Sequence, residues 1–222
     1  MFNGCKLKYD YNIIGDKFSD IAELQAGVTK SSNAPANWEG RFWARTGCNG
    51  QFTCDTGTCK PSLQCNGAGG APPVTLAEFR LNGHGGQDFY DISNVDGFNI
   101  PISIRPDRGC RSTSCSTNIN SFCPPELSVK GSRGNTVGCK SACLAFNQPQ
   151  YCCTGAFNNP NICKPTDYSR IFKNACPQAY SYAYDDASST FTCAAGANYA
   201  ITFCPANSMS FLSSVVSPYE DA

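Results

Sequence analysis

Three aspartates stand close together in a chain that otherwise uses charge sparingly. Only 15% of the 222 residues are charged, yet residues 87–99 contain Asp88, Asp91 and Asp96. Apolar residues are interleaved with them, a pattern typical of a strand with one buried face. Crowded carboxyl groups can donate and accept protons, and crowding raises the pKa of at least one because like charges resist joint ionisation. The segment indicates either a carboxylate-lined cleft or, without function, turns and a solvated strand edge.

The overall charge excludes two classes of partner. Seventeen basic and seventeen acidic residues cancel, so no global field attracts nucleic acid or an anionic membrane surface. The longest apolar runs fall far short of the roughly 20 residues that cross a bilayer. We therefore expect no nucleic-acid partner and no membrane span.

The sixteen cysteines indicate disulfides rather than metal ligands. An even number at this density is typical of a chain that folds in an oxidising compartment. Metal sites usually combine repeated Cys pairs with histidines, and His84 is the single histidine. We expect a secreted, extracellular protein with no metal and no cofactor. The first fifteen residues lack an apolar core and a cleavage site, so we expect no secretory signal peptide in this chain.

The elements that would position the aspartates are short strands. Period-two alternation and Gly or Asn turns between the segments favour a β-sandwich. The segments 138–146 and 166–176 are the best helix candidates, and Thr166 or Asp167 could cap the second. The predicted strands are residues 6–13, 40–46, 72–83, 86–93, 97–106, 188–193 and 198–205.

The layout predicts one mainly β domain over residues 1–205. Its β-sandwich core would comprise residues 1–46, 67–114 and 177–205. The tight cysteine block within 47–66 would form disulfide-stapled loops, and 115–176 a disulfide-rich lobe with short helices. Residues 206–222 contain no cysteine and are expected to form a poorly ordered tail.

Several segments together resemble the thaumatin-like family, which includes the plant pathogenesis-related group 5 proteins. The match runs in order from about Gly40 to Pro205, with the cysteines in register. It implies a thaumatin-like β-sandwich with an inserted disulfide-rich lobe. The segments are GRFWARTGC, PPVTLAEF, QDFYDIS, VDGFNIP, YCCTG, KPTDYSRIFKNACPQAYSYAYDD, STFTC and FCP.

The resemblance also implies a pairing for all the cysteines, which spacing alone could not choose. The eight implied bonds are Cys5–Cys204, Cys48–Cys54, Cys59–Cys65, Cys110–Cys193, Cys115–Cys176, Cys123–Cys139, Cys143–Cys152 and Cys153–Cys163.

An acidic cleft is a further implication of the resemblance, at Glu78, Asp91, Asp96 and Asp185. In the family, β-1,3-glucan binding and weak endo-β-1,3-glucanase activity are associated with the residues that match Glu78 and Asp96. Hydrolysis of a glycoside needs a carboxylic acid to protonate the leaving oxygen and a carboxylate as nucleophile or base. We expect Glu78 to be the acid and Asp96 the nucleophile or base.

Two positions favour a groove that binds without turnover. Plant members with the full cleft carry an Arg just before the Pro-Pro pair, where this chain has Ala71. Arg80 would lie on the same side of a strand as Glu78, and an ion pair between them would lower the pKa of the presumed acid. The aromatic residues Phe89, Tyr90 and Phe98 could stack on sugars in the cleft, although aromatics in strands more commonly pack in the core.

The sequence therefore predicts a secreted defence or cell-wall-directed monomer that binds β-1,3-glucan or another cell-wall polysaccharide and has, at most, weak endo-β-1,3-glucanase activity. The alternative is a protein-binding inhibitor module of digestive hydrolases, without glycosidase activity, whose partner is a microbial or digestive enzyme.

Overall fold

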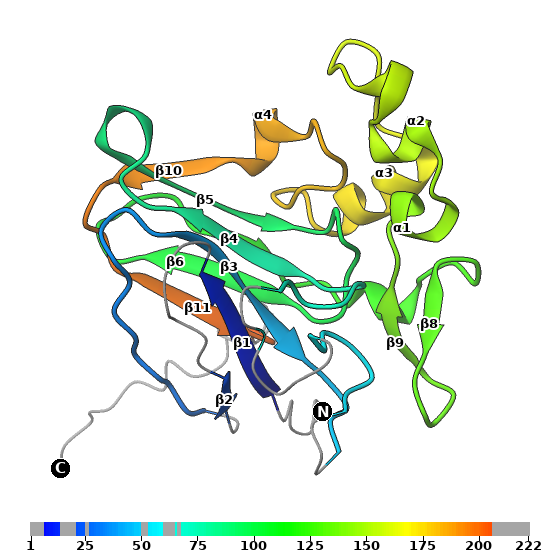
Figure 1. Cartoon of the computed structure of the whole chain (residues 1–222), viewed down its shortest axis with the longest axis horizontal. Coiled ribbons are helices and arrows are strands. Elements are labelled where there is room, and N and C mark those ends of the chain that lie inside the picture. The colour runs from blue at the N-terminus through cyan, green and yellow to red at the C-terminus, as the bar shows by residue number, and fades with distance from the viewer. Residues whose placement is uncertain are drawn as a thin grey trace, which may run out of the picture.

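The computed structural model describes residues 7–13, 21–24, 27–49, 53–59, 65 and 68–205, the first two ranges as backbone only. Two antiparallel sheets pack face to face, and a lobe with short helices lies beside one end of them (Figure 1). The expected tail, residues 206–222, lies outside the described residues. No helix among the described residues has the length and apolar character that a bilayer crossing requires.

The larger sheet has six strands in the order β10-β5-β4-β3-β1-β2. Each neighbouring pair is antiparallel. Because side chains alternate between the two faces of a strand, β3, β4 and β5 each turn one set inward and one set outward. The strands are β1 (Leu7–Ile13), β2 (Ile21–Leu24), β3 (Glu39–Arg45), β4 (Leu76–Arg80), β5 (Gln87–Ser93) and β10 (Phe191–Ala194).

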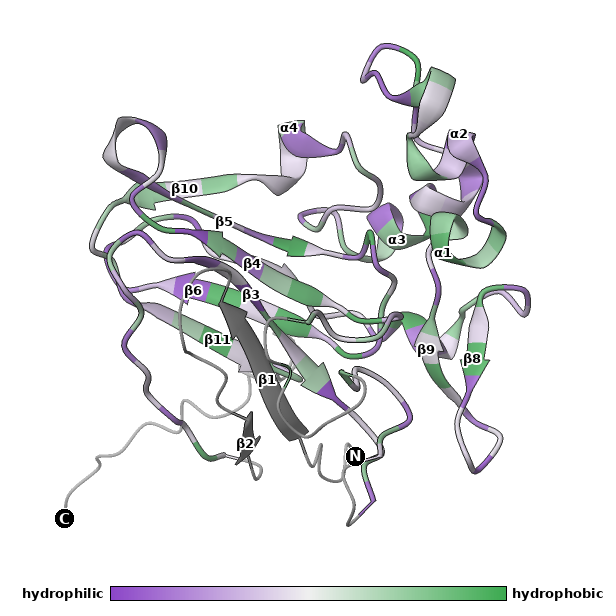
Figure 2. Ribbon diagram, viewed as in Figure 1, coloured by the Kyte–Doolittle hydropathy of each residue, from purple (hydrophilic) through white to green (hydrophobic). Residues whose placement is uncertain are grey.

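The main core lies between this sheet and a three-stranded sheet of order β11-β6-β7. The smaller sheet contains β6 (Ile102–Pro106), β7 (Thr113–Cys115) and β11 (Tyr199–Phe203). Ile102 and Ile104 are fully buried, together with Ile92 of the larger sheet. Phe79 stacks on Tyr90 with ring centroids 6.3 Å apart. Hydrophobic and hydrophilic residues alternate along these strands in Figure 2. This alternation is expected in a sandwich, where one face of each sheet packs in the core and the other is exposed to solvent.

The lobe contains a two-stranded sheet and short helical segments. Its longest helix, α3 (Asp167–Ala175), begins after the N-cap Thr166, whose hydroxyl accepts a hydrogen bond from the Ser169 backbone. Phe172 in α3 is buried in the main core and so anchors the lobe to the sandwich. The other elements are β8 (Ser128–Lys130), β9 (Thr136–Cys139), α1 (Ala142–Phe146), α2 (Pro149–Cys152), and the 3₁₀ turns η2 (Ile119–Ser121) and η3 (Gly155–Phe157).

Two further short segments lie along the sandwich. The 3₁₀ turn η1 (His84–Gly86) connects β4 to β5, and α4 (Asp186–Ser189) precedes β10.

Seven disulfides lie among the described residues, and they pair as the resemblance implied. The eighth expected bond, Cys5–Cys204, involves Cys5, which lies outside the described residues. Two of the seven bonds span long stretches of chain: Cys110–Cys193 closes 83 residues and Cys115–Cys176 closes 61. The remaining five are Cys48–Cys54, Cys59–Cys65, Cys123–Cys139, Cys143–Cys152 and Cys153–Cys163.

The outer face of the larger sheet is divided into a covered part and an open part. Trp43 on β3 is fully buried in a second apolar cluster with Val74, Leu76 and the Cys59–Cys65 bond. Its indole Nε1 donates a hydrogen bond of 3.0 Å to the Gly57 carbonyl. The disulfide-stapled loops therefore cover the Trp43 end of this face, and the neighbouring part is left for a groove.

Candidate functional site

An open groove of about 450 Å³ lies between the outer face of the larger sheet and the segment that leads into α4. Three strands, the turn after β5 and the segment 180–186 contribute its walls. The lining residues are Arg41, Leu76, Glu78, Asp91, Ser93, Val95, Asp96, Tyr180, Ala183 and Asp186.

Strand register places three charged residues in a row across the groove floor. Arg41 on β3 is opposite Glu78 on β4, and Glu78 is opposite Asp91 on β5. All three belong to the outward set of their strands, while their sequence neighbours Phe79 and Tyr90 belong to the core. The alternation that builds the core thus also lines up the charges.

A tight turn after β5 brings Asp96 back to the same groove. The buried Asn94 donates its backbone N–H to the Tyr180 carbonyl at 2.9 Å, and Gly97 donates to the Asn94 carbonyl at 2.9 Å. Gly97 has a φ of +87°, and a Cβ there would lie 2.6 Å from the Cys139 carbonyl oxygen. This position therefore requires glycine. The turn places Asp96 in the same groove as Glu78 and Asp91.

Asp186, rather than the expected Asp185, supplies the fourth carboxyl group of the groove. Tyr180 donates its hydroxyl to Asp186 Oδ1 at 2.8 Å, and both residues line the groove. Asp185 does not line it. Its carboxylate forms an ion pair with Lys173 at 2.9 Å and accepts hydrogen bonds from the Ser181 backbone and hydroxyl. Asp185 therefore stabilises the segment 180–186 that forms one wall, whereas Asp186 lines the groove.

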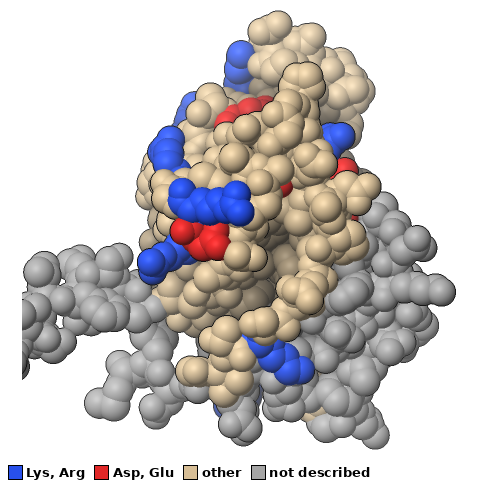
Figure 3. Space-filling view, turned by 90° about the vertical axis from the view of Figure 1, so that its left-hand side faces the viewer, with Lys and Arg blue, Asp and Glu red and all other residues tan. Residues whose placement is uncertain are grey.

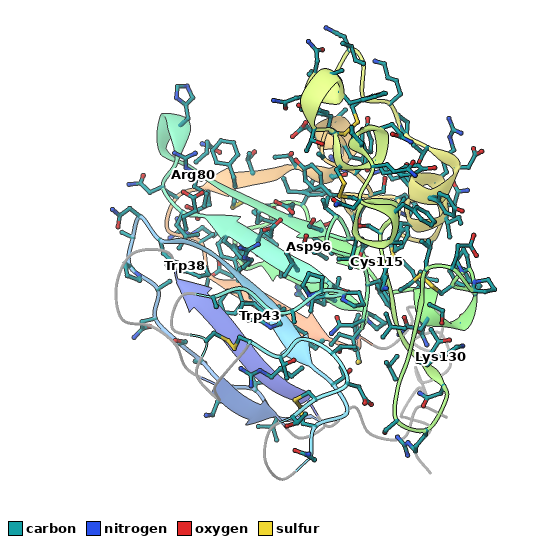
Figure 4. The ribbon with its side chains drawn as sticks, turned by 45° about the vertical axis from the view of Figure 1, so that its right-hand side comes forward. Trp38, Trp43, Arg80, Asp96, Cys115 and Lys130 are labelled. Atoms are coloured by element: carbon teal, nitrogen blue, oxygen red, sulfur yellow. A yellow bond between two sulfur atoms is a disulfide. The ribbon has the colours of Figure 1, made fainter. Side chains whose placement is uncertain are left out.

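The groove contains an arginine that the sequence analysis missed. Arg41 Nη1 lies 3.9 Å from Glu78 Oε1, so Ala71 does not leave the site without a cation. The expected pair between Arg80 and Glu78 does not form, because Arg80 lies at the far end of β4 and pairs with Glu39 at 3.7 Å (Figure 4). Once β3 is known to pair with β4, the alternation along each strand places Arg41 and Glu78 on one face.

Two of the three expected aromatic residues are unavailable to a ligand. Tyr90 and Phe98 are 1% and 0% exposed, inside the main core. Phe89 is half-buried against Gly83 and does not line the groove. Tyr180 is the aromatic residue that does line it. The expectation that Tyr90 and Phe98 stack on a sugar is therefore corrected.

Burial raises the pKa of three groove carboxyl groups. For Glu78 the Arg41 charge opposes the effect of burial, and the Asp96 charge adds to it. For Asp96, too, Arg41 opposes the effect of burial. Asp91 has the largest rise, to a pKa of about 8, because burial is reinforced by the charges of Glu78 and Asp186. A protonated carboxyl beside ionised ones is the combination that general acid–base chemistry requires.

Metal coordination is not suggested by the described residues, where no three His, Cys, Asp or Glu side chains are arranged to hold an ion. On the face shown in Figure 3, acidic and basic side chains lie next to each other within a mostly uncharged surface. The groove can accept hydrogen bonds through its carboxylates and donate them through Arg41, which suits a ligand rich in hydroxyl groups.

Comparison with known proteins places this arrangement in a family. The model of the Thaumatin family matches residues 13–205. Thaumatin-like protein 1 of Pyrus pyrifolia is 60% identical over 191 residues, which cover 82% of this chain and 78% of that protein. Pathogenesis-related protein 5 of Arabidopsis thaliana is 59% identical over 199 residues, covering 86% and 82%.

A third relative is named for an activity. The Glucan endo-1,3-beta-glucosidase of Prunus avium is 55% identical over 191 residues, which cover 82% of this chain and 78% of that protein. Since the family model matches most of the chain and these relatives agree with it, the chain belongs to the thaumatin family.

Proposed function

We propose that the groove binds β-1,3-glucan and hydrolyses it weakly, in a secreted protein with a defence or cell-wall-directed role. The observation that carries this proposal is the gathering of four carboxyl groups and one guanidinium in an open groove of about 450 Å³. That volume is within the range of about 300–1,000 Å³ typical of ligand sites. Carboxylates and arginine between them can accept from and donate to the hydroxyl groups of a sugar chain.

Three further observations support the proposal. A relative named as a glucan endo-1,3-beta-glucosidase supports the substrate class. A relative named as a pathogenesis-related protein supports the defence role. The seven disulfides among the described residues support an extracellular location.

Hydrolysis would use the carboxyl groups of the groove floor. Glycosidases require one protonated carboxylic acid and one carboxylate on either side of the scissile bond. Glu78 and Asp96, the pair expected from the sequence, both line the groove, and burial raises the pKa of each. The Arg41 charge limits that rise, so the groove would act slowly near neutral pH.

The test measures glucan binding and reducing-sugar release on the same samples, between about pH 4 and pH 8. The variants are Glu78→Gln and Asp96→Asn. Glu39→Gln is the matched control for the first, because Glu39 lies on the outer face of β3 but outside the groove. Asp167→Asn is the control for the second, because Asp167 is exposed on the lobe.

We expect wild type and both controls to bind glucan and release sugar slowly, and both groove variants to lose the release. If wild type binds glucan but releases no sugar, the binding part of the proposal stands and the hydrolase part is wrong. If wild type neither binds nor cleaves glucan, the proposal is wrong, and inhibition of a hydrolase by this chain becomes the function to assay.

A further inference from the structure

Glu78 and Asp91 form a like-charged pair at the centre of the groove. They are directly opposite each other in the antiparallel ladder of β4 and β5, on the same face. Like charges at directly opposite positions destabilise a sheet. In a half-buried setting two such carboxyl groups resist joint ionisation. One of the two therefore retains a proton at pH values where ordinary carboxyl groups have lost theirs.

The neighbours of each carboxyl decide which one keeps the proton. Glu78 has the Arg41 guanidinium at 3.9 Å, and a cation favours its ionised form. Asp91 lies one strand farther from Arg41 in the same row, and the negative charges of Glu78 and Asp186 both act on it. Its Oδ1 is buried and has no hydrogen-bond partner among the described residues. A buried, unpartnered oxygen makes the ionised form costly.

The other titratable groups of the groove point the same way. Asp186, on α4, accepts a hydrogen bond from the Tyr180 hydroxyl at 2.8 Å, so its carboxylate has a donor that Asp91 Oδ1 lacks. Asp96, in the turn after β5, is influenced by the positive charge of Arg41, which lowers its pKa against burial. Asp91 is the member of the set for which burial and the neighbouring charges all raise the pKa, to about 8.

We propose that Asp91 is the general acid of the groove and that Arg41 keeps Glu78 and Asp96 ionised for the complementary role. This assignment rests on the proposed glucan hydrolysis, and it moves the acid from Glu78, where the sequence analysis expected it, to the residue opposite. Asp91 was expected there only to bind substrate.

Cleavage of the glycosidic bond begins with a proton transfer from Asp91. The Asp91 proton passes to the glycosidic oxygen as the bond from C1 to that oxygen breaks, and the bonding electrons go to the oxygen. The oxygen of a water molecule finally forms the new bond to C1, either directly or after a carboxylate has held the sugar. The proton lost by that water returns a carboxyl group to its acid form, so one water is consumed for each bond cleaved.

The protonation state can be measured without any activity. In the intact, oxidised protein with ¹³C-labelled carboxyl groups, an NMR pH titration follows each carboxyl, and Asp91→Asn and Glu78→Gln identify the two signals. We expect Asp91 to titrate at a higher pH than Glu78. Glu78→Gln should lower the pKa of Asp91 by removing a like charge, and Arg41→Met should raise the pKa of Glu78. If Glu78 holds its proton to higher pH than Asp91, the assignment is overturned.

The chemical role is tested by the leaving group. Asp91→Asn should slow cleavage of β-1,3-glucan by about 10²–10⁴-fold, the usual contribution of a general acid. The loss should be much smaller on an aryl β-glucoside whose phenol leaves without protonation. Equal losses on both substrates would show that Asp91 only binds substrate.

A further outcome separates this inference from the proposed function. If wild type cleaves neither substrate, the hydrolase proposal is wrong and the acid role falls with it. If wild type is active but Glu78 holds its proton to higher pH than Asp91, only the acid role of Asp91 is overturned. The same holds if Asp91→Asn loses equal activity on both substrates.

Discussion

Lys173 and Asp185 form an ion pair of 2.9 Å that joins helix α3 to the wall of the groove. Their side chains are only 24% and 12% exposed. Lys173 also donates hydrogen bonds to the Ala179 carbonyl at 3.1 Å and to the Ser189 hydroxyl at 2.9 Å. These contacts bracket the segment that carries Tyr180 and Asp186. The lobe thus positions one wall of a groove whose floor belongs to the sheet.

Lys173→Met should destabilise the protein and weaken glucan binding. Removing one partner of a fully buried ion pair costs about 3–5 kcal/mol. Because Lys173 is partly exposed, we expect a loss at the lower end, about 3 kcal/mol. Guanidinium unfolding with the disulfides intact measures it. Arg170→Met is the control, because the Arg170–Asp167 pair on the same helix is exposed and should contribute little. Equal effects of the two substitutions would contradict a supporting role for Lys173.

Arg41→Met should raise the pKa of Glu78 and of Asp96, because it removes the charge that opposes the effect of burial on both. Glucan binding or cleavage that needs these groups ionised should then begin at higher pH, as a pH profile would reveal. Arg80→Met is the matched control. Since Arg80 pairs with Glu39, its removal should leave the profile unchanged, and a displaced profile in this variant would contradict the contacts described.

Asp91 should make the folded protein less stable as the pH rises. Its pKa is about 8 in the folded state and about 3.9 in an unfolded chain. Between these values the folded state binds more protons than the unfolded state, so the free energy of unfolding falls with increasing pH. This contribution is fully present below about pH 4 and is lost by about pH 8.

Asp91→Asn should remove that dependence, so that the variant gains stability over wild type as the pH rises towards 8. Chemical unfolding of both proteins at several pH values and constant ionic strength measures the difference. Asp167→Asn, at an exposed position, should follow wild type throughout. A constant difference between Asp91→Asn and wild type would show that Asp91 titrates in the ordinary range.

Asn99→Ala should be among the most destabilising single substitutions. Asn99 is 2% exposed, and its amide donates to the Ala44 carbonyl at 2.8 Å and the Thr56 hydroxyl at 2.9 Å. Its Oδ1 accepts the Thr75 backbone N–H at 3.0 Å. Leaving several of these buried groups unpaired should cost roughly 2–4 kcal/mol. Thermal unfolding measures this, and Asn198→Ala, at an exposed position, should shift the midpoint far less.

The longer strands could be predicted because their alternation shows directly in the sequence. The strands β1, β3, β5, β6 and β11, of five to seven residues each, lie within or next to the expected segments. The four-residue β10 overlaps the longer expected segment 188–193. No expected segment covers β2, β7, β8 or β9. These have only three or four residues each, and so short a run shows no period. In the expected strand over 72–83, β4 occupies only Leu76–Arg80, since two prolines at the start of that segment cannot donate to a ladder.

The candidate site was predictable as far as it depended on neighbours in sequence. Glu78, Asp91 and Asp96 line the groove as a set. Tyr90 could have been excluded, because a residue adjacent to Asp91 in a strand must point to the opposite face. Arg41 depends on the pairing of β3 with β4, and the choice between Asp185 and Asp186 depends on a contact with Lys173 in the lobe. Both contacts join distant parts of the chain, and no local pattern contains them.

The lengths of chain enclosed by the disulfides set an order of events during synthesis. Five of the seven bonds join cysteines 6–16 residues apart and can form during translation, soon after both cysteines have been synthesised. Cys110 and Cys115 must wait as thiols for Cys193 and Cys176. The wall that carries Tyr180 and Asp186 lies between those two late cysteines. A chain that stops before residue 176 would therefore form its five local bonds but lack this wall, so the groove can be completed only after the residues up to Cys193 have been synthesised.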